Sequence, residues 1–170
     1  MHILIATDGS LDPTTAADFA SALAGADGSV TVLTMVEINR NMLRDLRSLF
    51  GERFVDTSHQ DAEYVEMKPN TGTAVGADWP GDDEMLNRYL DDQKTLRTSD
   101  LVTALIAKGV TPEVTVREGE AASGIMTAIS DLAVDVVCVG SHGKGLFEGL
   151  LGSISTKLAR RSPTPVLIIR

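Results

Sequence analysis

The chain has 170 residues, 43% hydrophobic and 23% charged, with a formal net charge of −9. This composition is that of one folded domain and excludes a disordered or fibrous protein. The acidic balance argues against a surface for nucleic acid or anionic membrane, which requires clustered Lys and Arg. The sequence shows neither an apolar stretch of membrane length nor a signal peptide, and Cys138 has no second cysteine with which to form a disulfide. It therefore predicts a cytoplasmic protein.

The first third of the chain is expected to form a strand, a helix and a second strand. Residues 2–7, HILIAT, are an apolar run typical of a buried strand, and residues 8–10, DGS, follow as a loop. Residues 12–25 begin with Asp-Pro and end with Gly, which are the start and stop signals of a helix. Residues 29–37 are rich in Val and Thr and predict the second strand.

The segment from about residue 38 to residue 80 has the weakest pattern. Residues 41–50 have roughly helical spacing, whereas residues 68–83 have the composition of turns and loops. Residues 51–100 hold 12 acidic and 5 basic side chains. We interpret the chain as one domain, residues 1–170, with an extended acidic insertion at about 38–80. A solvated acidic face is the default interpretation, and a basic partner or a movable flap is the alternative.

The rest of the chain alternates helices and strands. A helical pattern runs from residue 82 or 83 to 109, and its polar middle, residues 91–100, is a candidate break. The elements expected after it are a strand at 112–118, a helix at 120–132, a strand at 134–140, a helix ending at 161 and a strand at 165–170. Such alternation predicts an α/β fold with a doubly wound, five-stranded, mostly parallel sheet and helices on both faces. Residues 134–140, VDVVCVG, are the most apolar and are expected inside the sheet.

Ligands of open parallel sheets bind beyond the carboxyl ends of the strands, where three segments are expected to meet. These segments are Ala6–Ser10, Met35–Glu37 and Gly140–Gly143. A carboxylate such as Asp8 can hold ribose hydroxyls, and the backbone near Met35 can contact an adenine edge. Glycine amides and a helix N-terminus at Ser153 can contact phosphates. The sequence therefore predicts a nucleotide site.

Each of these signals has a simpler interpretation. Asp8 could only cap the turn into the helix. His142 has no partnered Ser or Cys nucleophile, so it is better explained as a loop histidine that touches solvent or ligand. Lys144 does not lie in a P-loop, because the Gly-Lys-Ser/Thr order is absent. The spacing of metal-ligating residues indicates no metal site, although Mg²⁺ bound through nucleotide phosphates would need none.

In order, ILIATDGS, VTVLTMVE, VDVVCVGSHG, LLGSIS and KLARRSPTPVLIIR resemble the universal stress protein family, over roughly residues 2–37 and 110–170. The resemblance implies a Rossmann-like, adenine nucleotide alpha hydrolase-like fold that is usually dimeric. It also implies a division between members that bind ATP and members that do not. The members that bind ATP have the pattern Gly-x-x-Gly, followed by nine residues and then by Gly-Ser or Gly-Thr.

The resemblance and the residue pattern together assign a set of nucleotide-binding positions. They are Ala6, Thr7, Asp8, Met35, Val139, Gly140, His142, Gly143, Gly152, Ser153 and Ile154. Only eight residues separate Gly143 from Gly152, one fewer than the family pattern. A helix that starts one residue early is rotated by about 100° unless the loop absorbs the change. Gly145 and Gly149 offer that freedom, so we expect binding to be retained, with loss of binding as the alternative.

Three functions follow from these observations. The first is an ATP-binding stress-response regulator, with Mg²⁺ held through the phosphates, no assigned catalytic residue and at most weak ATPase activity. The alternative is a nucleotide-free dimeric module that recognises a protein partner through its acidic insertion. The third is a hydrolase or nucleotidyl transferase in which His142 or Lys144 acts on phosphate. We expect a homodimer through the strand Pro165–Arg170, unless that edge strand is covered by its own chain.

Overall fold

The structure is a computed structural model that describes residues 1–38, 82–141 and 151–170. The chain forms two units, one of Met1–Glu37 with Leu90–Arg170 and one of Ile38–Tyr89. Most of the expected insertion, the short helix expected at 41–50, and residues 142–150 of the glycine segment lie outside the described residues. The interpretation as one domain with an insertion therefore stays a prediction.

The described elements follow the expected alternation. They are β1 (His2–Ala6), α1 (Pro13–Ala24), β2 (Ser29–Val36), α3 (Asp82–Ala107), β3 (Glu113–Glu118), α4 (Ala121–Asp131), β4 (Val136–Gly140), α5 (Ser153–Arg161) and β5 (Val166–Ile169). The candidate break at residues 91–100 is wrong, because α3 is continuous through them. This segment contains neither Gly nor Pro, and the Thr98 hydroxyl donates to the Lys94 carbonyl at 2.7 Å within the helix.

The five strands form one sheet in the order β3-β2-β1-β4-β5, and every neighbouring pair is parallel. Ile5 of β1 is aligned with Val32 of β2 on one side and with Cys138 of β4 on the other. The expected doubly wound α/β fold is confirmed. β4 lies inside the sheet, as its apolar sequence predicted, and β5 forms one edge.

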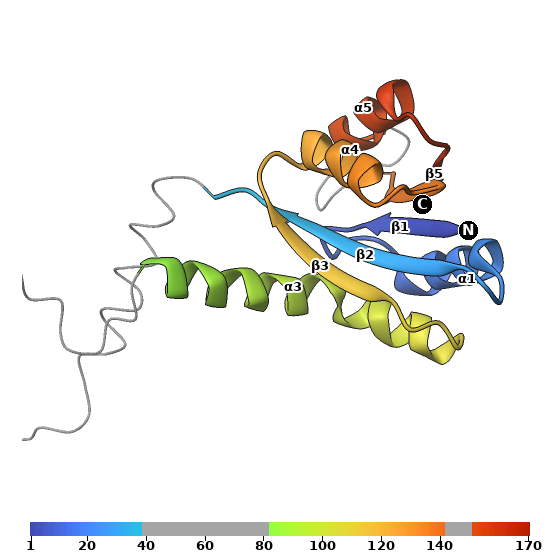
Figure 1. Cartoon of the computed structure of the whole chain (residues 1–170), viewed down its shortest axis with the longest axis horizontal. Helices are drawn as coiled ribbons and strands as arrows, with labels where there is room; N and C mark the ends of the chain where they lie inside the picture. The colour runs from blue at the N-terminus through green and yellow to red at the C-terminus, as the bar shows by residue number, and fades with distance from the viewer. Residues whose placement is uncertain (39–81, 142–150) are drawn as a thin grey trace, which may run out of the picture. The chain divides into compact units, whose positions relative to one another are not determined.

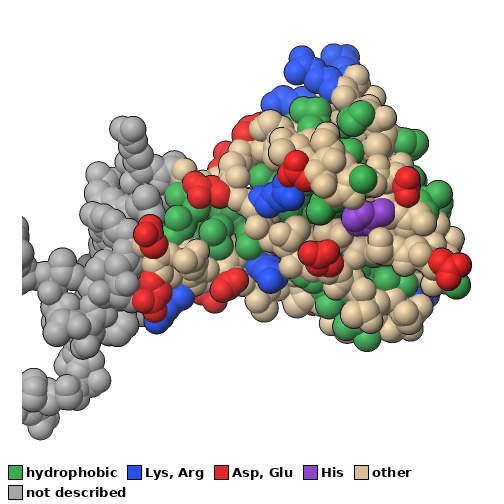
Figure 2. All heavy atoms as spheres, viewed as in Figure 1, with side chains coloured by type: hydrophobic (Ala, Val, Ile, Leu, Met, Phe, Trp, Pro, Cys, Tyr) green, Lys and Arg blue, Asp and Glu red, His purple; other side chains and the backbone are tan. Residues whose placement is uncertain are grey.

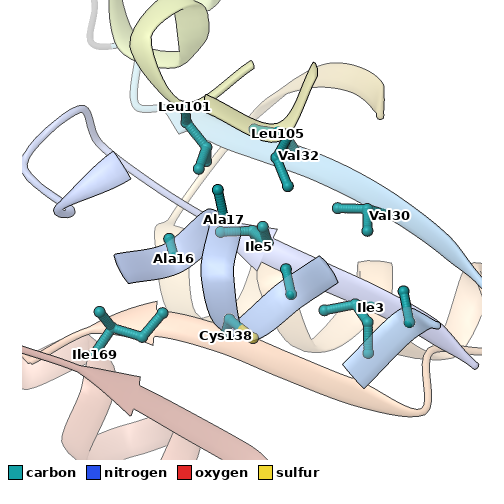
Figure 3. Close-up of a cluster of buried hydrophobic side chains, with 12 residues drawn as sticks. Ile3, Ile5, Ala16, Ala17, Val30, Val32, Leu101, Leu105, Cys138 and Ile169 are labelled. Atoms are coloured by element: carbon teal, nitrogen blue, oxygen red, sulfur yellow. The ribbon is translucent and has the colours of Figure 1, made fainter. Parts of the chain in front are cut away.

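Helices cover both faces of the sheet, α1 and α3 on one and α4 and α5 on the other (Figure 1). Alternate residues of β1 point to opposite layers, so Ile3 and Ile5 pack with α1 and α3 whereas Leu4 and Ala6 pack with α4 and α5. The first layer is shown in Figure 3, where the small side chains of α1 let that helix lie close to the sheet. These alanines are Ala16, Ala17, Ala20 and Ala24.

Basic side chains gather over α5 on the face shown in Figure 2, whereas acidic side chains are dispersed. The last turn of α5 carries Arg160 and Arg161, where positive charge favours the negative end of a helix dipole. Within the described ranges, no helix combines the length and the apolar character that a bilayer span requires.

Candidate functional site

A cavity of about 230 Å³ lies at the carboxyl ends of β1, β2 and β4. Its lining residues are Ala6, Thr7, Asp8, Ser10, Leu11, Leu33, Met35, Ala121, Ile125, Val139, Gly140, Gly152, Ser153, Ile154 and Ser155. Every predicted site residue that the structure describes is in this set. The other two, His142 and Gly143, lie outside the described residues. The cavity is therefore where the parallel sheet led us to expect a ligand.

Sequence reasoning missed part of the wall, chiefly its apolar members Leu11, Leu33, Ala121 and Ile125. Two of these had a usable signal. Leu33 precedes Met35 by two residues and so lies on the same face of β2, and Ile125 belongs to the apolar stripe of α4. Ser155 had no such signal, because its hydrogen bond to the Ser141 carbonyl forms only when α5 packs against the end of β4.

The loop after β1 is shaped by its own side chains. The Thr7 amide donates to the Leu33 carbonyl at 3.0 Å, which extends the pairing of β1 with β2 by one bond. Asp8 Oδ1 accepts from the Ser10 amide at 3.0 Å and from the Ser10 hydroxyl at 2.5 Å. Asp8 thus holds its turn, as the simpler interpretation proposed. Both bonds end on Oδ1 and the side chain is exposed, so this role and a ligand contact are compatible.

Met35, at the end of β2, has its backbone and its side chain held by different neighbours. Arg97 of α3 donates from Nη1 to the Met35 carbonyl at 2.9 Å. The Met35 side chain extends to α4, where it reaches Gly124, and a Cβ on that glycine would overlap Met35 Cε. Gly124 therefore makes room for Met35 at the wall of the cavity.

The start of α5 is tied directly to the end of β4. The Ser141 carbonyl accepts from the Gly152 amide at 2.7 Å and from the buried Ser155 hydroxyl at 2.9 Å. The Ser155 hydroxyl also contacts the Gly152 carbonyl at 3.0 Å. These bonds place the first turn of α5 against the cavity although the glycine loop is one residue short. Ser153, the first residue of α5, lines the cavity.

Two helices, α4 and α5, begin near the cavity. They differ in whether a side chain accepts a hydrogen bond from the first backbone amides of the helix. Glu120 caps α4 by accepting from the Ser123 amide at 2.8 Å, and Lys157 lies 3.0 Å from the same carboxylate. The Ser123 hydrogen bonds, followed by Lys157, lower the pKa of Glu120 to about 2. Within the described chain, no side chain caps α5 at Gly152. The positive end of α5 is therefore the better place for an anionic ligand.

Reactive groups at the cavity are few in the described part of the chain. No group of three His, Cys, Asp or Glu side chains there could hold a metal ion. Cys138 is a fully buried residue of β4, and this burial raises its pKa to about 12, so it is no nucleophile at neutral pH. The described arrangement is suited to holding a ligand by backbone amides and apolar walls.

The sequence matches the model of the universal stress protein family over residues 1–170. The chain belongs to the universal stress protein family. The match confirms the resemblance, and it also includes the middle segment, where the residues alone carried no likeness. Universal stress protein YxiE of Bacillus subtilis (strain 168) is 42% identical over 64 residues, which are 37% of this chain and 43% of YxiE. The match thus spans less than half of that relative.

Solved structures show the same fold. Hypothetical protein MJ0577 superposes with a TM-score of 0.63 at 22% identity, over 99% of this chain and 94% of that one. A universal stress protein in complex with cAMP superposes with a TM-score of 0.54 at 20% identity, over 100% of this chain and 97% of its own. This universal stress protein therefore has the adenine nucleotide alpha hydrolase-like fold expected from its motifs.

Proposed function

We propose that this universal stress protein binds an adenine nucleotide, ATP in the first place, and acts in the cytoplasm as a nucleotide-dependent stress-response regulator with slow or no hydrolysis. One observation carries the proposal. All described residues of the predicted site line one cavity, and the N-terminus of α5, which no described side chain caps, forms part of its wall. A helix N-terminus of this kind binds phosphate through its free amides.

The chemistry of the wall suggests an orientation for the nucleotide. The amides of Ser153 and Ile154 would donate to the phosphates, because the Gly152 amide already donates to the Ser141 carbonyl. Asp8 would accept from the ribose hydroxyls. The apolar side chains between β2, β4 and α4, with the Met35 backbone, would receive the base. Mg²⁺ would be held through the phosphates, because the described residues offer no cluster of metal ligands.

Two further observations support binding without fast turnover. In the described part of the chain, the cavity wall includes no cysteine, histidine or lysine that could act as a nucleophile or base. The universal stress protein solved with cAMP has the same fold, which supports an adenine nucleotide as the ligand class. Residues His142 and Lys144, on which the hydrolase hypothesis depends, lie outside the described residues.

Calorimetric titration with ATP and Mg²⁺ tests the proposal, and proline at the first position of α5 tests its mechanism. Ser153→Pro removes one amide donor but suits the helix start, because proline is favoured there and Gly152 is already extended at φ −62° and ψ 163°. We expect Ser153→Pro to lower the affinity for ATP about tenfold relative to Ser153→Ala, which keeps the amide. The reason is that a hydrogen bond to a charged group contributes roughly 1.5–3 kcal/mol to binding.

Adenosine provides the matched ligand control, because it lacks phosphates and should bind both variants equally. Absence of heat and of any thermal shift at millimolar ATP would leave the alternative function, a nucleotide-free module that recognises its partner through the acidic insertion. In that case partner capture should be unchanged by Ser153→Pro.

We also propose a homodimer through Pro165–Arg170. Among the described residues, β5 pairs with β4 alone, and its residues Val166, Leu167 and Ile168 are half-buried. Its outer edge would therefore offer backbone groups to a second copy of the chain. Sedimentation at micromolar concentration should show a species of twice 18.1 kDa. A single species of 18.1 kDa would contradict the dimer.

A further inference from the structure

We infer that one side of α1, the side that carries Phe19 and Leu23, is a docking surface for a second copy of this chain. We call it the α1 flank. In the dimer, the α1 flanks of both copies close over the paired β5 strands. The inference deepens the proposed homodimer through Pro165–Arg170 and rests on it.

The surface of α1 is almost free of charge, although the chain has a net charge of −9. Asp18 is the only charged residue of Pro13–Ala24, and it forms an ion pair with Lys108, just after α3. Phe19 is 50% exposed and Leu23 is 39% exposed. Because the exposed side of a surface helix ordinarily carries charged residues, exposed apolar side chains without them indicate contact with another surface.

The α1 flank faces the β5 side of the helix. In Figure 3, Ala16 lies on the side of α1 towards Ile169 of β5, and Ala17 lies on the side towards α3. Successive residues of a helix turn by about 100°, so Leu23 and Phe19 lie about 20° and 60° beyond Ala16, away from Ala17. The flank therefore borders the outer part of the sheet, opposite the side that forms the ion pair.

The neighbouring face of β5 is only partly covered by the described chain. Leu167 and Ile169 pack with the layer of α1 and α3, whereas Val166 and Ile168 pack with the layer of α4 and α5. In the first layer α3 lies over β2, so α1 is the described helix of this layer that is nearer to β5 (Figure 3). Leu167 is half-buried beside it. The α1 flank and Leu167 thus form one apolar surface that reaches the edge of the sheet.

The length of β5 shows why a dimer through this strand needs a further surface. β5 has four residues, Val166–Ile169, and is about 13 Å long at a rise of about 3.3 Å per residue. Stable interfaces bury roughly 800 Å² on each partner, which is more than the edge of so short a strand offers. The α1 flank supplies apolar area directly beside it.

Symmetry brings the two flanks to the same place. Antiparallel pairing of β5 with its copy has a two-fold axis perpendicular to the sheet, so both α1 helices lie on one face of the joined sheet. The two flanks then enclose Leu167 of both copies. An uncharged surface suits this contact, because like charges that meet across a two-fold axis repel each other.

Sedimentation equilibrium of the full chain and of Phe19→Ser tests the inference. We expect Phe19→Ser to raise the dissociation constant of the dimer about a hundredfold. The change enters the interface once from each copy, and loss of a partly buried aromatic side chain costs about tenfold each time. Phe19→Leu keeps an apolar side chain and should restore most of the affinity. Ile106→Ser is the matched control, because Ile106 is 57% exposed on α3, and it should leave the dissociation constant unchanged.

The outcomes separate the inference from the proposed dimer. An equal dissociation constant for wild type and Phe19→Ser would overturn the role of the α1 flank and leave the homodimer through Pro165–Arg170 standing. A wild-type chain that sediments only as a monomer would overturn both. Circular dichroism checks that each variant is folded. If Phe19→Ser is not, Leu23→Ser applies the same test one turn later in α1, and a dimer as tight as wild type would again overturn the inference.

Discussion

Replacing Ser155 with alanine tests whether the bonds between β4 and α5 position the candidate phosphate site. Ser155 is 2% exposed, and its hydroxyl oxygen lies 2.9 Å from the Ser141 carbonyl oxygen and 3.0 Å from the Gly152 carbonyl oxygen. Alanine is nearly the same size, so the change removes the hydrogen bonds without leaving a large cavity. The variant should therefore be less stable, and its α5 should begin less firmly against the sheet.

The expected loss can be worked out from the partners that remain. The Ser141 carbonyl keeps its bond from the Gly152 amide at 2.7 Å, and the Gly152 carbonyl keeps its bond from the Thr156 amide at 2.9 Å. Neither acceptor is left unsatisfied, so the free energy of unfolding should fall by about 1 kcal/mol, the net value of one hydrogen bond, and not by about 3 kcal/mol. For a chain of this size, about 1 kcal/mol corresponds to a Tm lowered by roughly 2–4 °C.

Thermal and urea unfolding measure this difference, with Ser130→Ala as the control. Ser130 is an exposed serine of α4 whose hydroxyl donates to the Met126 carbonyl at 3.3 Å, so its loss should change stability by less than about 0.5 kcal/mol. ATP affinity should fall in Ser155→Ala but not in Ser130→Ala. Equal stability and equal affinity of the two variants would refute the reasoning.

Three further predictions concern other parts of the site and core. The pKa of Glu120 is lowered from its ordinary 4.5 to about 2, so its carboxylate stabilises the fold above pH 4.5 and that contribution disappears as the pH falls towards 2. Urea unfolding of Glu120→Gln should accordingly vary less with pH over that range than wild type, and identical curves would contradict this. Cys138, with its pKa raised to about 12, should react with a thiol reagent only after unfolding, and rapid labelling of the native protein would contradict its burial. Gly124→Ala should stabilise a Met35→Ala variant by about 1 kcal/mol but give little or no gain in wild type, where its methyl meets Met35 Cε; additive effects in a double-mutant cycle would disprove that contact.

Much of the fold is determined by local sequence. The start of α1 is an example, because Asp12 accepts from the Thr15 amide at 2.7 Å and Pro13 occupies the first helical position, as the Asp-Pro signal predicted. The apolar strands and the glycine and proline breakers set the alternation of elements, and parallel pairing follows from it. These features depend on residues close together in the chain, so the sequence alone was sufficient.

The polar middle of α3 shows where local pattern was misleading. Residues 91–100 read as a candidate break because their charged side chains interrupt the apolar stripe. The helix continues because buried Thr98, Leu101 and Leu105 anchor its second half in the unit that holds the sheet, and because residues 91–100 contain neither Gly nor Pro. Packing against the sheet decided this, and packing is a property of distant residues.

For the candidate site, the sequence by itself determined which residues end the strands, and therefore which segments meet at the carboxyl edge. Only the tertiary structure decided how these segments are held. Ser155 ties α5 to Ser141, 14 residues earlier, and Arg97 reaches Met35 across 62 residues of chain. Neither partner is marked by spacing or residue type, because both bonds depend on how a helix in one layer approaches the end of a strand. The way in which the wall of the cavity is held together is thus a consequence of packing.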